Sequence, residues 1–239
     1  ADLGGGRWRF RAPARPGVRA LTWRHGDRTR TVRLLVARPL AEARRGVLNG
    51  YRVGHYADEP LRGLEVYAPP RGLVEVTRDM VDLRVSPNFR LGDFLCKQSH
   101  GFPRYLLLRT ELLLKLEQLL ARAREAGIAS EPFTIMSGYR TPYYNRAIGN
   151  TTTYSRHLYG GAADVYIDES PRDGIMDDLN GDGRSDLEDA GVLYGLVDDL
   201  AGEQQSTALA GGLARYPANH VHGPFVHLDA RGYAARWGH

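Results

Sequence analysis

Two histidines and one aspartate have residue types and a spacing typical of a catalytic metal site. His157 and Asp164 are separated by a Gly-Gly turn and two alanines, and Asp164 opens an apolar, strand-like run. His227 alternates with apolar residues in a second strand-like run, residues 225–229. The small residues at 160–163 allow the backbone to come close to a neighbour. Two imidazoles and one carboxylate leave a fourth position for water, as in catalytic rather than structural zinc sites.

A second set of oxygen donors lies in the acidic segment between Asp164 and His227. Residues 178–189 carry side-chain oxygens at positions 1, 3, 5, 9 and 12 of a calcium loop, with Gly183 at position 6 for the sharp turn. The predicted calcium ligands are Asp178, Asn180, Asp182, Arg184 (through its backbone carbonyl), Asp186 and Asp189. As in dockerin-type loops, the last position is Asp rather than Glu, and only the exiting helix, at about 187–201, is expected. We therefore predict a structural Ca²⁺ in an insertion at about 168–190, with a solvated Asp/Gly-rich turn as the alternative.

Three ordered motifs surround the metal candidates. They are residues 137–142 (Ser-Gly-Tyr-Arg-Thr-Pro), 155–164 (Ser-x-His-x-x-Gly-x-Ala-x-Asp) and 225–229 (Phe-Val-His-Leu-Asp). Together they resemble the zinc D-Ala-D-Ala carboxypeptidase and murein endopeptidase family, which includes lysostaphin-like and hedgehog-like folds. Residues 94–97 and 211–217 resemble its bacterial murein endopeptidase branch. The resemblance covers about residues 86–239.

The resemblance implies a zinc-dependent peptidase. Zn²⁺ would be held by His157, Asp164 and His227, an activated water would attack, and the substrate would be a peptide bond in a peptidoglycan stem peptide or cross-link. Arg140 occupies the motif position of a substrate-facing arginine, where it would clamp a carboxylate or stabilise the oxyanion. A salt bridge inside the fold is the alternative role for Arg140.

The general base of the reaction is not assigned by the resemblance. Related enzymes commonly place Glu or His two residues before the third zinc ligand, and here that position is Phe225. His222 and His220 precede it in a loop and could turn towards the zinc, with exposed loop histidines as the alternative for both. His222 is the preferred candidate. Asp229 shares a strand face with His227 and is expected to orient that ligand, unless it is a surface carboxylate at the strand end.

Several elements must position these residues within the predicted peptidase domain, residues 86–239. A helix is expected at about 109–126, with Thr110 as its N-cap and an apolar stripe of leucines. The apolar residues 132–136 predict a buried strand. A short helix is expected over 141–149, because Thr at the N-cap and Pro at the next position both favour a helix start. With the two strand-like ligand segments, they predict an α+β fold in which helices flank a small antiparallel sheet.

The N-terminal third of the chain has a different texture. Residues 7–77 are punctuated by Gly or Pro every 8–12 positions, and the runs between are rich in Val, Leu, Tyr, Trp and Arg. This pattern predicts a small all-β domain of unknown role over residues 1–85. The predicted strands are Arg7–Arg11, Val18–Trp23, Thr31–Val36, Tyr51–Tyr56 and Leu64–Tyr67. Because arginines alternate with apolar residues, their charge is expected on a solvated sheet face, with contact to a polyanion as the alternative.

Charge is distributed unevenly along the 239 residues, although the formal net charge is only +4. Residues 1–50 hold 12 basic and 3 acidic groups (+9), and residues 151–200 hold 3 basic and 12 acidic groups (−9). Crowded carboxylates are costly unless a cation joins them, so the acidic part favours bound metal. With 42% hydrophobic and 25% charged residues, the composition is globular and excludes a disordered or fibrous protein.

Neither a membrane span nor a disulfide is expected. No apolar run approaches the ~18 residues that cross a bilayer. The single cysteine, Cys96, excludes an intrachain disulfide and a thiolate metal cluster. Residues 1–6 have neither the basic nor the apolar region of a signal peptide. The resemblance to peptidoglycan-cleaving enzymes implies a periplasmic or secreted protein, whose signal peptide is expected to have been removed. No nucleic-acid partner is expected, and the oligomeric state is left open.

The leading hypothesis is a zinc metallopeptidase that cleaves peptidoglycan peptides, as a D,D- or L,D-endopeptidase or as a carboxypeptidase. Because Phe225 stands where a base is expected, a non-hydrolytic peptidoglycan-binding module containing zinc and calcium is the alternative. A third hypothesis is a calcium-dependent interaction protein whose His and Asp residues are only structural.

Overall fold

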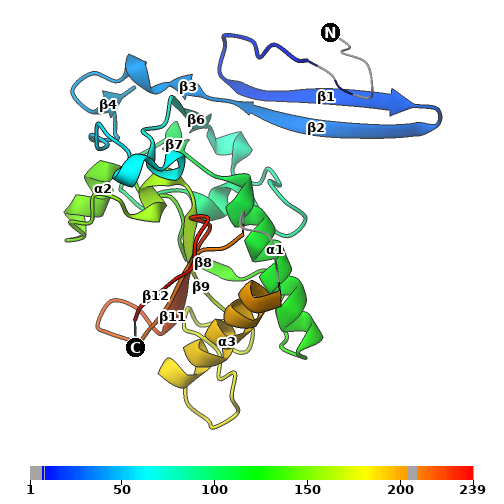
Figure 1. Ribbon diagram of the computed structural model, residues 1–239, viewed down its shortest axis with the longest axis vertical. Coiled ribbons are helices and arrows are strands. Elements are labelled where there is room, and N and C mark those ends of the chain that lie inside the picture. The colour runs from blue at the N-terminus through cyan, green and yellow to red at the C-terminus, as the bar shows by residue number, and fades with distance from the viewer. Residues whose placement is uncertain (1–6, 8, 204–208, 239) are drawn as a thin grey trace.

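The elements that carry the candidate ligands assemble into a mixed helix and sheet structure, shown as a computed structural model in Figure 1. The structure describes residue 7 and residues 9–203 and 209–238. Its strands are β1 (Gly17–His25), β2 (Arg28–Val36), β3 (Arg38–Pro39), β4 (Val47–Leu48), β5 (Tyr51–Arg52), β6 (Gly72–Val76), β7 (Arg104–Leu106), β8 (Thr134–Ser137), β9 (Ala162–Tyr166), β10 (Gly212–Tyr216), β11 (Phe225–Asp229) and β12 (Ala235–Arg236). The α-helices are α1 (Thr110–Glu125), α2 (Pro142–Ala147) and α3 (Leu187–Glu203). Short 3-10 helices are η1 (Leu40–Glu42), η2 (Leu61–Gly63), η3 (Glu65–Tyr67), η4 (Arg78–Met80), η5 (Leu91–Phe94) and η6 (Arg156–Tyr159).

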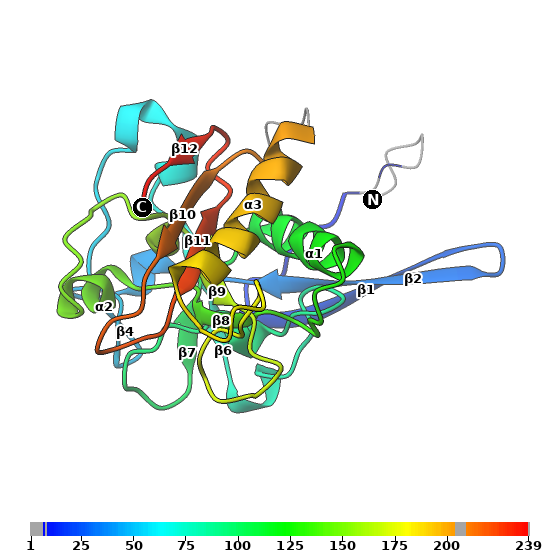
Figure 2. The ribbon, with the colours of Figure 1, turned by 90° about the horizontal axis from the view of Figure 1, so that it is seen from below.

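A five-stranded sheet forms the centre of the C-terminal part, in the order β12-β10-β11-β9-β8. Neighbouring strands are antiparallel, except that β12 runs parallel to β10. The two central strands are buried, β11 along its whole length and β9 over all but its last residue. α3 packs against β10 and β11, and α1 lies beside α3 (Figure 2). This mixture of helices and a largely antiparallel sheet is compatible with the predicted α+β class.

The helix predicted at 109–126 forms as α1. Its leucines recur every three or four residues on the buried side, which is the spacing of one helix face. The predicted N-cap at Thr110 is wrong by one residue, because Arg109 holds the N-cap position and no side chain caps the helix. The strand predicted at 132–136 forms as β8, shifted towards Ser137. It is half-buried along its length rather than buried as predicted, because it lies at the edge of the sheet. Among the helices of the described residues, none is long and apolar enough to cross a membrane.

α2 begins as its sequence predicts. The Thr141 side chain accepts a hydrogen bond from the Tyr144 backbone N–H at 3.0 Å, and Pro142 takes the first helical position. The helix ends at Ala147, two residues before Gly149, which has a φ of +81°. This short helix directly follows the motif that contains Arg140.

The all-β domain predicted over residues 1–85 is not confirmed. β1 and β2 do form one antiparallel hairpin from the predicted strands 18–23 and 31–36. The predicted strand 51–56 shortens to β5, because Gly54 has a φ of +81° and approaches α2 so closely that a Cβ would lie 2.7 Å from the Tyr143 nitrogen.

Two further predicted strands of this region are absent from the described residues. The predicted strand 64–67 forms the 3-10 turn η3 instead, which buries the Tyr67 ring. In the predicted strand 7–11, residues 7 and 9–11 have no regular secondary structure, and Trp8 lies outside the described residues.

Residues 38–85 share a hydrophobic core with the C-terminal part. β6 pairs with β7 across the predicted boundary at residue 85. Tyr51 and Leu73 belong to the same buried cluster as Leu106 of β7 and Leu116 of α1. The division into two domains stays a prediction, but among the described residues it does not separate two cores.

The hairpin of β1 and β2 projects from the body of the protein (Figure 1). Val18 and Leu35 at its base pack against the core, whereas residues 22–33 are exposed. Seen from below, the hairpin extends well beyond the helices and the central sheet (Figure 2).

Candidate metal centre

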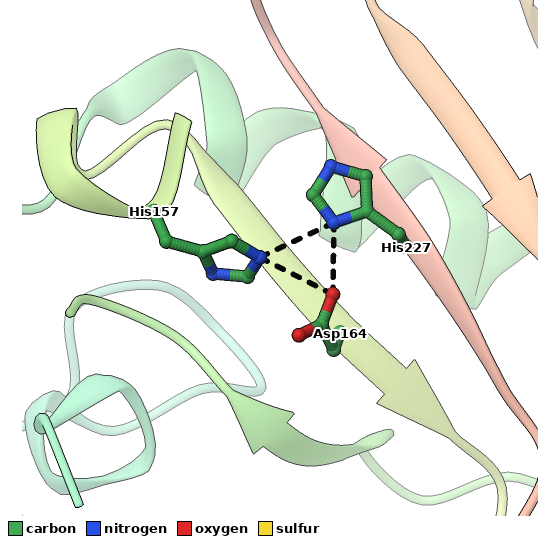
Figure 3. Close-up of side chains that lie close together, drawn as sticks. All are labelled: His157, Asp164 and His227. Atoms are coloured by element: carbon green, nitrogen blue, oxygen red, sulfur yellow. Dashed lines mark hydrogen bonds and ion pairs between the residues drawn. The ribbon is translucent and has the colours of Figure 1, made fainter. Parts of the chain in front are cut away.

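His157, Asp164 and His227 converge from three elements, as Figure 3 shows. His157 comes from η6, and Asp164 and His227 face each other as a directly paired position of β9 and β11. The Oδ1 atom of Asp164 lies 2.8 Å from His227 Nδ1 and 3.2 Å from His157 Nε2, and the two nitrogens are 3.2 Å apart. All three side chains are buried. The structure thus brings together the three residues that the sequence predicts as zinc ligands.

The glycines before Asp164 allow η6 to approach its neighbours closely. Gly160 has a φ of +65°, and a Cβ there would lie 2.4 Å from the Leu107 carbonyl oxygen. A Cβ on Gly161 would lie 2.3 Å from the Arg156 guanidinium. The prediction that small residues permit a close backbone approach at this turn is confirmed.

A backbone hydrogen bond sets the orientation of the His157 ring. Its Nδ1–H donates to the Gly138 carbonyl oxygen at 2.7 Å, which leaves Nε2 to face Asp164 and His227. Gly138 itself packs tightly on η5, because a Cβ would lie 2.7 Å from the Phe94 Cα. A metal-ligating histidine commonly donates its second ring N–H in this way, which fixes its tautomer.

Arg140 contacts a candidate ligand directly. Its Nη2 forms an ion pair with Asp164 Oδ2, and its Nε donates to the Ser137 hydroxyl at 2.7 Å. Asp164 therefore presents Oδ1 to the histidines while Oδ2 is held by the arginine. The alternative role in the sequence analysis, a salt bridge inside the fold, is present. Arg140 also lines the adjoining cavity.

Asp229 lies behind His227 and is fully buried. Its Oδ2 is 3.4 Å from His227 Nε2, the nitrogen that points away from the other ligands. The carboxylate also accepts hydrogen bonds from the Gly212 backbone at 2.8 Å and from Arg231 Nε at 2.9 Å. The Nζ of the buried Lys115 donates to the Asp229 carbonyl oxygen at 2.8 Å. Asp229 is thus placed to orient His227 and is not a surface carboxylate.

Burial and pairing shift the proton affinities of these groups. Burial raises the pKa of Asp164, but the charges and hydrogen bonds of His157 and His227 outweigh it and hold that pKa well below its usual range. Burial lowers the pKa of His157, which favours the neutral ring that binds a metal. Burial also lowers the pKa of His227, but hydrogen bonds to Asp164 and Asp229 more than offset it and raise that pKa.

A cavity of about 770 Å³ opens in front of the three candidate ligands. Three guanidinium groups line it, those of Arg140, Arg156 and Arg231. Aromatic rings also line it, including those of Tyr67, Tyr216, Tyr233 and Trp237. Among the described lining residues, Asp164 is the one carboxylate. Arg140 pairs with Asp164 and Arg231 pairs with Asp229 just behind the lining, so these five groups together leave a net charge of 3 − 2 = +1.

The two loop histidines are placed differently from each other. His222 lines the cavity and packs edge-on against Phe225, with ring centroids 4.9 Å apart. Its ring nitrogens contact the Asn219 side-chain amide and the Gly223 carbonyl oxygen, each at 2.8 Å. His220 is exposed and is not a lining residue of the cavity. Only His222 therefore remains near the site.

The predicted calcium loop forms a series of tight turns closed by its own carboxylates. Asp178 accepts backbone hydrogen bonds from Gly181 and Gly183, both at 2.7 Å, and the bond from Gly183 contributes most to lowering its pKa. The carboxylate of the fully buried Asp189 accepts from Leu179 and Asp186, also at 2.7 Å. Gly183 has a φ of +84°, as a sharp turn requires. In the described part of the chain, the gathered His, Cys, Asp and Glu ligand atoms are those of His157, Asp164 and His227, not those of this loop.

The geometry of the three candidate ligands fits zinc. Ligand atoms placed tetrahedrally at ~2.0–2.2 Å from Zn²⁺ lie about 3.3–3.6 Å from one another. The three distances between the ligand atoms, 2.8, 3.2 and 3.2 Å, are close to that range. Two imidazole nitrogens and one carboxylate oxygen are also ligands that zinc accepts, and a second partner holds each of them.

Comparison with known proteins supports a metallopeptidase. The family model described as Peptidase M15 matches residues 88–187, which is 100 of the 239 residues. The matched part includes His157 and Asp164 and ends before His227. Zinc-dependent peptidase activity is the class of function that this match supports. No match was found among curated proteins or among solved structures.

Several contacts of the site have no signal in the sequence analysis. The Gly138 carbonyl that orients His157 is a backbone group, so its role depends on the fold alone. Arg231, two residues beyond Asp229, pairs with that carboxylate, and Trp237 packs its ring 5.2 Å from that of His227. The Asp-x-Arg spacing at the end of the predicted strand 225–229 could have indicated the pair of Asp229 and Arg231.

Proposed function

We propose that the protein is a zinc peptidase that hydrolyses peptide bonds in peptidoglycan stem peptides or cross-links. The observation that carries the proposal is the buried His157–Asp164–His227 group at the floor of a cationic cavity. The Peptidase M15 match supports the peptidase class. The substrate and the murein endopeptidase branch rest on the motif resemblance described above.

The chain supplies a preorganised ligand set for this reaction. Zinc, when bound there, lowers the pKa of a coordinated water to near 7 and polarises the scissile carbonyl. Gly138, Arg140 and Asp229 hold His157, Asp164 and His227 respectively, so the ligand atoms already face one another. Such preorganisation avoids the cost of ordering the ligands when the metal binds.

The charges that line the cavity favour an anionic peptide. Arg140, Arg156 and Arg231 line it, and Asp164 is the one carboxylate among its described lining residues. Guanidinium groups bind carboxylates through paired hydrogen bonds. Peptidoglycan stem peptides carry free carboxylates, which this lining would accept. We further propose that Arg140, besides holding Asp164, contacts the substrate carboxylate or the oxyanion.

His222 is proposed as the proton-transfer residue that replaces the missing base at Phe225. It lines the cavity on a loop, and breaking its contact with Asn219 would free a ring nitrogen. The His222→Ala variant should lose at least tenfold in kcat while its zinc affinity is unchanged. His220→Ala removes an exposed neighbour of the same loop and serves as the matched control. Equal activity of the two variants would exclude His222.

The decisive experiment is incubation with purified peptidoglycan. The zinc-loaded protein should release new amino groups, and His157→Ala should release none while retaining its circular dichroism spectrum. The products also separate the modes of cleavage, since free D-alanine indicates a carboxypeptidase and cleaved cross-links indicate an endopeptidase. Full activity of His157→Ala would refute the zinc assignment.

A non-hydrolytic peptidoglycan-binding module is the second candidate. The observation that favours it is the lack of an obvious general base. Phe225 fills the position expected for that base, and the described lining residues of the cavity include no Glu. Retention of the protein on peptidoglycan without release of amino groups would select this candidate.

We also propose that residues 178–189 bind a structural Ca²⁺ next to α3. The support is the ligand spacing together with the turns at Gly181 and Gly183, which have φ of +78° and +84°. Calcium at a hundred times its Kd should stabilise the zinc-loaded protein by about 2.7 kcal/mol. The double variant D178N/D182N should lose this response, whereas the surface variant Asp198→Asn should keep it. If removal of Ca²⁺ with zinc still bound changes neither Tm nor turnover, this proposal is wrong.

The proposed substrate is consistent with a periplasmic or secreted protein, which we propose as its location. Fractionation of cells that express the full-length gene tests this location.

A further inference from the structure

The hairpin of β1 and β2, residues 17–36, has two distinct faces. Directly opposite residues of an antiparallel pair share a face, so the pairing places Leu21 with Val32, Trp23 with Arg30, and His25 with Arg28 on one side. The Trp23 and His25 rings on this side are stacked, with centroids 6.1 Å apart and an interplanar angle of 5°. The tip of the hairpin therefore presents a flat aromatic platform next to two arginines.

The other face of the outer hairpin is polar. It carries the pairs Ala20 with Arg33, Thr22 with Thr31, and Arg24 with Thr29. The hydroxyls of Thr22 and Thr31 are 3.2 Å apart and exposed. The side of the hairpin opposite Trp23 therefore presents hydroxyl and guanidinium groups.

Residues 17–36 are strongly cationic. They contain five arginines and one acidic residue, Asp27, which gives 5 − 1 = +4 without the histidine. We call this segment the cationic hairpin. A two-stranded hairpin is marginally stable alone in water. In this one, Val18 and Leu35 pack against the core and residues 31–35 line a cavity shared with the body, so the part that projects beyond these contacts is residues 22–30. Charge and exposure together indicate a surface that is covered by a partner.

We propose that the cationic hairpin binds an anionic glycan, that is, a sugar polymer bearing carboxylate or phosphate groups. Arg28 and Arg30, which lie on the same face as the two rings, would pair with the negative groups. The stacked Trp23 and His25 rings would pack against the apolar C–H face of a sugar ring. The proposal goes beyond the peptidase function and does not depend on the zinc site.

Three other occupants fit the observations less well. A second copy of the chain would bring two hairpins of net charge +4 together, and they would repel each other. Charged edge strands also disfavour strand pairing. Duplex nucleic acid keeps its base faces stacked, so it would leave the Trp23–His25 platform uncovered. A membrane surface needs a continuous apolar face, whereas the large apolar side chains exposed on the hairpin are Trp23 and Val32, at 48% and 56%.

The test uses the full chain and measures affinity for polygalacturonate at low ionic strength, with neutral dextran as the reference polymer. The variant R28S/R30S should bind about fivefold more weakly, since each exposed ion pair contributes a few tenths to 1 kcal/mol. The matched control R45S/R71S removes two exposed arginines of the body and should bind within about twofold of the parent. Trp23→Ala should bind about threefold more weakly. Binding should weaken as salt is added.

Further arms of the test guard against unfolding and against other partners. The thermal midpoint of every variant is measured, and R28K/R30K, which keeps the charge, should bind within about twofold of the parent. Equal losses in the two serine variants, or loss of binding in the lysine variant, would overturn the proposal. So would tighter binding to duplex DNA or to vesicles of phosphatidylglycerol and phosphatidylcholine than to polygalacturonate, or equal binding to dextran.

Discussion

Replacement of Asp229 by Asn tests how the site holds its third ligand. The substitution keeps the shape of the side chain but removes the charge that faces His227 Nε2 at 3.4 Å and Arg231 Nε at 2.9 Å. Loss of an outer partner of a metal-bound histidine typically weakens metal binding 10- to 100-fold. We therefore expect the Kd for zinc to rise by that factor, which is about 1.4–2.7 kcal/mol.

The same substitution also affects the stability of the fold, in an amount that can be separated from the zinc effect. Removing one member of a buried ion pair costs about 3–5 kcal/mol, and the 16% exposure of the Arg231 side chain reduces this to about 2–4 kcal/mol. For a chain of this length the Tm should fall by about 5–15 °C. Asp198→Asn is the matched control, because Asp198 pairs with Arg236 on the surface and its loss should cost at most about 1 kcal/mol.

The assay is competition for zinc between the folded protein and a chelating indicator, well below the Tm of each variant. Calorimetry of the metal-free proteins gives the stability change independently. If Asp229→Asn lost stability as expected but bound zinc within twofold of the parent, the contact at 3.4 Å would have no role in orienting His227. Weaker zinc binding by Asp198→Asn would show that the loss reflects net charge instead.

Three other substitutions test separate parts of the structure. Arg140→Lys keeps the charge but cannot contact both Asp164 and the Ser137 hydroxyl, so zinc binding should weaken about tenfold if Arg140 positions Asp164. A change in KM alone would show that Arg140 contacts the substrate instead. Gly160→Ala should destabilise the fold by about 2–4 kcal/mol in thermal unfolding, because the φ of Gly160 is +65° and a Cβ would lie 2.4 Å from a carbonyl oxygen. The control Gly174→Ala, at a φ of +86° but with open space around it, should cost about 1 kcal/mol. Equal costs for the two variants would contradict the close approach at Gly160. Burial lowers the pKa of Lys115 from 10.5 to about 8. Between pH 8 and pH 10.5 the unfolded chain binds more protons at Lys115 than the folded chain does, so the free energy of unfolding rises with pH. The Lys115→Met variant lacks this rise, and its stability relative to the parent, measured by urea unfolding, should fall by about 2–3 kcal/mol between pH 7 and pH 10. A difference in stability that does not change with pH would contradict the lowered pKa of Lys115.

The sequence was informative about the metal ligands because their signals are local. His157 and Asp164 are seven residues apart around a glycine turn, and His227 alternates with apolar neighbours. The direct pairing of Asp164 with His227 depends on strand register, which no local pattern contains. The choice of His227 Nδ1 as the inward nitrogen likewise depends on where Asp229 lies in the fold.

The N-terminal predictions failed where tertiary contacts override local preference. The Val- and Tyr-rich residues 64–67 have strand propensity but form η3, and the Val66 carbonyl oxygen there accepts from Arg109 at 3.4 Å. The strand predicted at 51–56 ends early because Gly54 meets α2, which is far away in the sequence. The regular spacing of Gly and Pro predicted full strands correctly only in the hairpin of β1 and β2. There the strands pair with each other, so their contacts join segments that are close in the sequence.

The pairing of Asp164 with His227 has a consequence for how the chain can be altered. These two positions are 63 residues apart in sequence, yet neighbouring strands bring them within 2.8 Å. The intervening segment, which includes the acidic loop and α3, is closed at both ends by the sheet. Each doubling of a flexible loop costs only about 0.6 kcal/mol in closure entropy. Domains or affinity tags inserted into the exposed turn at Gly174, outside the proposed calcium ligands, should therefore leave the ligand geometry intact, which makes this turn a grafting point for redirecting the proposed peptidase to new surfaces.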